Sequence, residues 1–119
     1  MLGGLGAGLA RTQAAEVAQL ALELVGLTSL VDMRARTLSG GELQRLAIAR
    51  AACLHRPFVL ADEPTGALDA ATTSVVMDAF VAVARRGTGV VIATHDEVVA
   101  QMSDRTIELH MGRCRAVQR

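Results

Sequence analysis

Apolar residues recur at helical spacing in three stretches of the chain. The first stretch reads TQAAEVAQLALELVG, and Gly26 is placed to end the helix. The second extends from Ser39 to about Leu54. The third is expected from about Ala70 to Arg85, with Asp69 as its N-cap. The pattern therefore predicts three amphipathic helices.

Two short apolar runs, each followed by polar residues, predict strands. FVLAD, from Phe58 to Asp62, has the character of a buried parallel strand, and GVVIATHD, from Gly89 to Asp96, repeats it. A short helix is expected from Asp96 to about Met102, and RTIEL, from Arg105 to Leu109, predicts a strand that runs into a turn at MGR. Strands that alternate with helices imply an α/β sheet with helical crossovers.

Polar residues at the ends of the two strands predict a site. Ligands of open α/β sheets bind outside the carboxyl ends of the strands, so we expect Asp62, Glu63 and His95 to gather there. The first carboxylate would hold the shell of a Mg²⁺ ion, the second would orient or deprotonate a water, and the imidazole could reach a terminal phosphate. A solvated turn explains an Asp-Glu-Pro sequence equally well, and both interpretations stand at this point.

Two adjacent glycines open the second predicted helix. Ser39 through Glu42 fits the capping box S-x-x-E, which accounts for the serine and the glutamate. It does not account for Gly40 and Gly41, each of which costs roughly 1 kcal/mol against alanine in a helix. Bare backbone lets an anion approach the first-turn N–H groups, where the helix dipole favours negative charge. The pair therefore favours a phosphate contact.

Composition narrows the class of protein. The 119 residues suit one domain or a piece of one, and 51% are hydrophobic although only two are aromatic. The formal charge is +0 and all 12 basic residues are scattered arginines, so we expect no nucleic-acid partner. Cys53 and Cys114 lie far apart without a CxxC pair, which argues against a structural metal or disulfide. No apolar run has the roughly 18 residues of a membrane span, which favours a globular, intracellular chain.

Three motifs together resemble one family. LSGGELQRLAIARA, FVLADEPTGALD and VVIATHD, in this order and spacing, are similar to the ATP-binding cassette (ABC) ATPases. The wording ADEPTGALD most resembles the ATPases of lipoprotein-releasing and macrolide-exporting systems. The resemblance implies an α/β, partial P-loop NTPase fold. It makes residues 1–57 part of the helical subdomain and residues 58–119 the C-terminal half of the nucleotide-binding core.

The resemblance assigns the first set of roles to the signature motif, Leu38 to Glu42. Ser39 and Gly41 would be its phosphate contacts, with Gly40 beside them in the nucleotide-binding set. Glu42 also belongs to the nucleotide-binding set. It stands where the family usually has glutamine, a departure expected to weaken the nucleotide contact while it keeps the capping box.

The other implied roles lie in the second half of the chain. Asp62 becomes the Mg²⁺-side carboxylate of Walker B, acting through water, and Glu63 the catalytic base. Gly66 to Asp69 match the D-loop, where Asp69 would face nucleotide and the family often has serine first. His95 matches the switch histidine that contacts the γ-phosphate. ATP and Mg²⁺ are the implied cofactors.

A Walker A motif is missing from the printed sequence. G-x-x-x-x-G-K-[ST] needs a lysine, and the sequence contains none. The opening GGLGAG lacks that lysine and is interpreted as a loop or a helix lead-in. We therefore expect the C-terminal half of a cassette without the Walker A strand and loop. The family fold would place that strand beside Gly89 to Thr94, so an exposed apolar edge is expected there.

Three functions follow from the resemblance. The favoured one is an ATP-binding subunit of an ABC transporter that couples ATP binding and hydrolysis to transport, present as a truncated cassette and inactive by itself. Its partners would be a second ABC ATPase subunit across the nucleotide and transmembrane permease subunits, at the cytoplasmic face of the cell membrane. An alternative is a non-hydrolysing half-cassette that supplies a signature face to another ATPase, or a decayed remnant. A cassette of DNA repair or translation is the third, without support from a basic or coiled-coil region.

Overall fold

The structure, a computed structural model, describes residues 11–30 and 37–117. The glycine-rich opening, predicted to be a loop or helix lead-in, lies outside these residues. The elements in chain order are α1 (Arg11–Leu24), the 3₁₀ helix η1 (Thr28–Leu30), α2 (Gly40–Cys53), β1 (Phe58–Asp62), α3 (Ala70–Arg85), β2 (Gly89–Ala93), α4 (Glu97–Gln101), β3 (Thr106–His110) and β4 (Arg113–Val117). Every predicted helix and strand is confirmed to within about two residues, and β4 is an additional strand that was not predicted.

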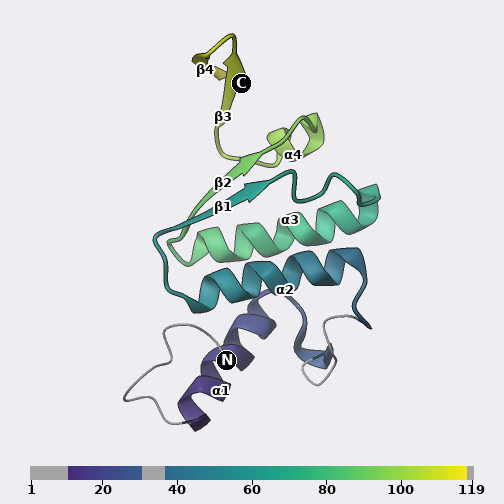
Figure 1. Cartoon of the computed structure of the whole chain (residues 1–119), viewed down its shortest axis with the longest axis vertical. Coiled ribbons are helices and arrows are strands. Elements are labelled where there is room, and N and C mark those ends of the chain that lie inside the picture. The colour runs from purple at the N-terminus through teal and green to yellow at the C-terminus, as the bar shows by residue number, and fades with distance from the viewer. Residues whose placement is uncertain (1–10, 31–36, 118–119) are drawn as a thin grey trace.

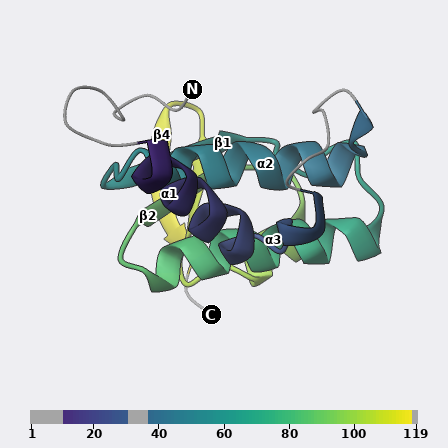
Figure 2. The same ribbon diagram turned by 90° about the horizontal axis from the view of Figure 1, so that it is seen from below.

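The strands β1 and β2 form a parallel pair connected through α3. Their register runs from Phe58 opposite Gly89 to Asp62 opposite Ala93. The helices stack on one side of this pair: α3 lies next to the strands, α2 packs beside α3, and α1 crosses on the side away from the sheet (Figure 1, Figure 2). This is the α/β arrangement that the alternation of strands and helices predicted.

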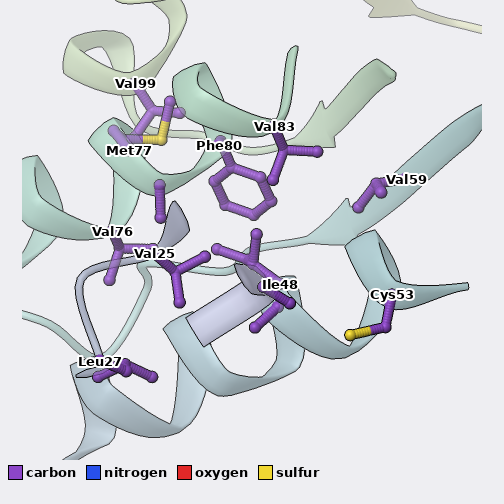
Figure 3. Close-up of a cluster of buried hydrophobic side chains, with 13 residues drawn as sticks. Val25, Leu27, Ile48, Cys53, Val59, Val76, Met77, Phe80, Val83 and Val99 are labelled. Atoms are coloured by element: carbon purple, nitrogen blue, oxygen red, sulfur yellow. The ribbon is translucent and has the colours of Figure 1, made fainter. Parts of the chain in front are cut away.

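The hydrophobic core is built mainly between the three long helices. Figure 3 shows Val25, Ile48, Val76, Phe80 and Val83 turned toward one another, with Val59 reaching in from β1. The core draws its members from both of the predicted segments, 1–57 and 58–119, and the division into two segments remains a prediction. None of the helices within the two described ranges is long and apolar enough to cross a bilayer.

One face of the strand pair is exposed, which corrects the prediction of a buried strand. Val59 faces the helices, whereas Phe58, Leu60 and Val91 are 64%, 77% and 55% exposed. Side chains alternate between the two faces of a strand, and in the described part of the chain the helices cover only one of them. The sheet there has only β1 and β2, so the outer edge of β2 is unpaired, as the sequence led us to expect.

The hairpin of β3 and β4 extends beyond α4 at the far end of the molecule (Figure 1). A two-residue turn joins its strands, and both residues have positive φ, 48° at Met111 and 76° at Gly112. Two positive φ values define a type I′ turn, whose twist matches that of antiparallel strands. Ile107 and Leu109 on one face of the hairpin are 58% and 76% exposed.

Candidate functional site

The residues singled out in the sequence lie at one end of the molecule. Figure 1 shows that α2 and α3 both begin at the end of the sheet where β1 and β2 terminate. Parallel strands direct their carboxyl ends to the same edge, and each crossover returns the chain so that the next strand ends there too. Two helix N-termini and two strand tips therefore share this end.

The first turn of α2 is a complete capping box. The Glu42 N–H donates to Ser39 Oγ at 3.2 Å, and the Ser39 N–H donates to Glu42 Oε1 at 2.9 Å. The hydrogen bond from the Ser39 N–H is the main cause that holds the pKa of Glu42 below its ordinary value, and the Ser39 side chain adds to it. The N–H groups of Gly40 and Gly41 have no acceptor within the helix. The backbone at the start of α2 thus presents donors to an incoming anion.

Gly41 has a packing reason that sequence analysis missed. It is buried, and a Cβ added to it would overlap Thr72 Cγ2 on α3. A Cβ on Gly40 would meet only Leu68 Cδ2, at 3.3 Å. No local pattern in the sequence announces this contact, because Thr72 belongs to a different helix. Close packing against α3 therefore accounts for Gly41, and a phosphate contact at the same residue is a proposal added to it.

At the tip of β1, Glu63 and His95 are brought together as predicted. The His95 N–H donates to Glu63 Oε1 at 2.9 Å, and the ring nitrogen Nδ1 of His95 lies 3.3 Å from the same oxygen. The Thr94 hydroxyl donates to Glu63 Oε2 at 3.2 Å, a contact that the sequence did not reveal. The His95 side chain is 98% exposed and that of Glu63 42%. The contacts with His95 and Thr94 therefore orient the Glu63 carboxylate, which is still partly exposed to solvent.

Asp62 ends β1 opposite Ala93 and is exposed. Across the described residues, no three histidine, cysteine, aspartate or glutamate side chains form a group that could hold a metal ion. Mg²⁺ in phosphate-transfer sites is usually held by one or two carboxylates together with water and substrate phosphates. A single exposed carboxylate at a strand tip fits that donor set.

Asp69 caps α3, as predicted. The Thr72 N–H donates to Asp69 Oδ1 at 2.7 Å. Hydrogen bonds from the Thr72 side chain and then from its backbone N–H hold the pKa of Asp69 below its ordinary value. Asp69 Oδ1 thus accepts a hydrogen bond from the first turn of α3. A contact between Asp69 and nucleotide would use the exposed part of the carboxylate.

Comparison with known proteins gives one consistent family. A family model described as ABC transporter matches residues 7–66, half of the chain. The chain is 48% identical over 108 residues to the lipoprotein-releasing system ATP-binding protein LolD of Legionella pneumophila (strain Paris), covering 89% of the chain and 47% of LolD. It is 42% identical over 105 residues to the uncharacterized ABC transporter ATP-binding protein YknY of Bacillus subtilis (strain 168), covering 88% and 46%. The chain thus spans about half the length of the curated relatives that it matches.

Solved structures agree with this result. CbiO1 of Clostridium perfringens, described as part of the ABC transporter complex CbiONQ, superposes with a TM-score of 0.85 at 29% identity, over 94% of this chain and 45% of that protein. The dimeric bacterial ABC transporter cassette MJ0796 superposes with a TM-score of 0.75 at 33% identity, over 95% and 51%.

Proposed function

The chain belongs to the ABC transporter family of ATP-binding proteins, and from this premise we propose that it is the signature and Walker B part of a subunit that couples ATP hydrolysis to transport. The observation that carries the proposal is that α2 begins at the end of the molecule where β1 and β2 terminate, and that Glu63 and His95, which directly follow these strand ends, contact each other. Both would contact phosphate. Packing against α3 accounts for Gly41, but it does not account for the exposed pair Glu63 and His95.

The start of α2 would bind the terminal phosphate of ATP held by a second cassette. Ser39 supplies a hydroxyl, and Gly40 and Gly41 supply N–H groups that have no helical acceptor. A helix N-terminus favours an anion by about 0.3 to 1 kcal/mol at the surface. The cassette MJ0796 is described as a dimer, which supports a second ATPase subunit as partner.

Glu63 would act as the general base on the attacking water. Its carboxylate is held by the His95 N–H and the Thr94 hydroxyl, which leaves an oxygen lone pair free to accept a proton from water. His95 is exposed enough for its ring to turn toward a γ-phosphate. Asp62 would hold Mg²⁺ through water, and the bound ion would neutralise charge on the phosphates.

Hydrolysis would need a lysine-bearing phosphate loop, and the 119 residues contain no lysine. We propose that it comes from a Walker A segment that completes the sheet beside β2. Permease subunits at the cytoplasmic face of the membrane would be the remaining partners. That CbiO1 is described as part of the complex CbiONQ supports assembly with further subunits.

A second candidate function is a half-cassette that offers only its signature face to another ATPase. The intact capping box at Ser39 and Glu42, present in a sequence without lysine, favours it. On this alternative, Glu63 and His95 would not take part in turnover.

The test joins the chain to the Walker A half of a relative such as the Legionella LolD and measures Mg²⁺-dependent phosphate release. We expect ATP turnover in the joined protein and none in the 119-residue chain alone. Glu63→Gln should keep ATP binding and lower turnover at least ~10²-fold, the low end of general-base catalysis. Glu97→Gln, a change in a nearby acid on α4, is the matched control and should leave turnover intact. Normal turnover with Glu63→Gln would remove Glu63 as the base, whereas no turnover in the joined protein without substitutions would favour the second function.

A further inference from the structure

The signature helix and the D-loop helix touch where each begins. Gly41 on α2 is buried under Thr72 on α3, and Gly40 lies under Leu68 of the D-loop, whose Cδ2 is 3.3 Å from the position of a Cβ. Val76 continues the contact one turn further along α3 and is fully buried. The donors proposed to bind phosphate are thus packed directly against the turn that carries Asp69.

Thr72 contacts both Asp69 at the start of α3 and Gly41 on α2. Its backbone N–H donates to the Asp69 carboxylate at 2.7 Å. Its methyl group, Cγ2, covers the face of Gly41 from which a side chain would project. Hydroxyl and methyl branch from one Cβ, and β-branched side chains have few χ1 choices in a helix. The backbone bond to Asp69 therefore holds Thr72 in place, and the few χ1 choices keep its methyl on Gly41.

We propose that Thr72 is a positioning residue that couples the D-loop to the phosphate-binding turn of α2. The inference rests on the proposed function, in which the N–H groups of Gly40 and Gly41 bind phosphate. It concerns how these N–H groups are held in a constant position relative to Asp69. Glycine is the most conformationally free residue, so a contact from α3 restricts the first turn of α2 further than its capping box does. A movement of the D-loop is transmitted through the Thr72 methyl to these N–H groups.

Two substitutions separate the methyl from the hydroxyl. Thr72→Ser keeps the hydroxyl and deletes the methyl, whereas Thr72→Val keeps the methyl and deletes the hydroxyl. The readout is amide hydrogen exchange at Glu42 and Leu43, whose N–H groups bond Ser39 Oγ at 3.2 Å and Ser39 O at 2.9 Å. Thr72→Ser should speed exchange at these two amides about fourfold, the effect of one lost methyl contact, and leave the second half of α2 unchanged. Thr72→Val should stay close to the unsubstituted chain.

Uniform acceleration along α2, or equal effects of the two substitutions, would show that Thr72 only stabilises the fold and would overturn the inference. No change with Thr72→Ser would overturn it as well.

A second measurement keeps this inference apart from the proposed function. Association of the chain with an intact ATP-loaded cassette, followed by sedimentation velocity, should weaken by a similar, roughly fourfold factor in Thr72→Ser and not in Thr72→Val. If the unsubstituted chain fails to associate, the proposed function is wrong, while the exchange pattern still decides the role of Thr72. If association is normal and Thr72→Ser leaves it intact, the function stands and the coupling is wrong.

Discussion

At the scale of single residues, Glu63 has a backbone conformation that is rare for its type. Its φ is +46°, in the left-handed region that favours glycine. Its N–H still pairs with Ala93 O at 2.8 Å, so the chain turns directly after the last hydrogen bond of the sheet and aims the carboxylate at Thr94 and His95. Such conformations cost of order 1–3 kcal/mol and cluster at functional sites. The conformation at Glu63 therefore agrees with a role beyond stability.

The two capping carboxylates give the fold an acid-sensitive contribution. The pKa of Glu42 and the pKa of Asp69 are both lowered in the folded chain, the first mainly by the Ser39 N–H and the second mainly by the Thr72 side chain. A lowered pKa stabilises the fold above the unfolded values, roughly 4.3 for Glu and 3.9 for Asp. The contribution is lost as pH falls through the folded values. We expect the free energy of unfolding to decline below about pH 4.5.

Urea unfolding from about pH 6 to about pH 3 measures this decline. The double variant Glu42→Gln and Asp69→Asn keeps both caps but removes both titrating groups, so its acid dependence should be weaker. An unchanged dependence would place the acid-sensitive groups elsewhere.

Local residue patterns predicted the caps but not the contacts between distant segments. Ser39 and Asp69 were recognised because a cap and its partner lie within one turn of each other. The contact of Thr72 with Gly41 was not predicted. The contact of Arg45 was not predicted either: its Nη1 donates to Val25 O at 3.2 Å and to Gly26 O at 3.3 Å, which connects the end of α1 to α2. Each of these contacts depends on how helices pack, which no local pattern encodes.

At the scale of elements, strand β4 shows that the hydrophobic pattern of a segment does not always predict its secondary structure. Its sequence RCRAV is exposed throughout, carries two arginines and alternates polar and apolar residues over only four positions, so no apolar run marked it as a strand. Its conformation follows from pairing with β3, from Thr106 opposite Val117 to His110 opposite Arg113, and Arg115 adds a 3.0 Å ion pair with Glu108. The long helices were predicted well because each has its own periodicity, and α2 and α3 also have cap signals.

The turn of this hairpin predicts a stabilising substitution. Met111 has a φ of 48° in a type I′ turn, where asparagine is the preferred residue. Met111→Asn should stabilise the hairpin by up to about 1 kcal/mol, since the left-handed strain of an ordinary side chain costs of order that amount. Thermal unfolding and amide exchange in β3 and β4 measure the effect. Met111→Ile places a β-branched side chain at the same φ and should act in the opposite direction; equal results for both variants would contradict the turn assignment.

At the scale of the whole molecule, the open face of the sheet makes the chain prone to self-association. Phe58, Leu60 and Val91 form a neighbouring set on that face, and the outer edge of β2 is unpaired in the described part of the chain. Exposed apolar patches and free strand edges both favour association. Leu60→Lys should lower the weight-average mass seen by sedimentation velocity at high concentration.

The matched control for this prediction is Val98→Lys, which alters an exposed valine (59%) on α4, outside the two strands. If it lowers self-association as much as Leu60→Lys does, general surface charge and not the sheet face is responsible.

The connection through α3 also sets an order of folding. The whole of α3 separates β1 from β2 in the sequence, and parallel pairing across such a separation is slow because loop closure must precede it. The helices contribute most of the core and can collapse together without the strands. We therefore expect the contact between Glu63 and His95 to be among the last to form. A partly folded chain, during synthesis or after stress, would already present the start of α2 while the contact between Glu63 and His95 had not yet formed.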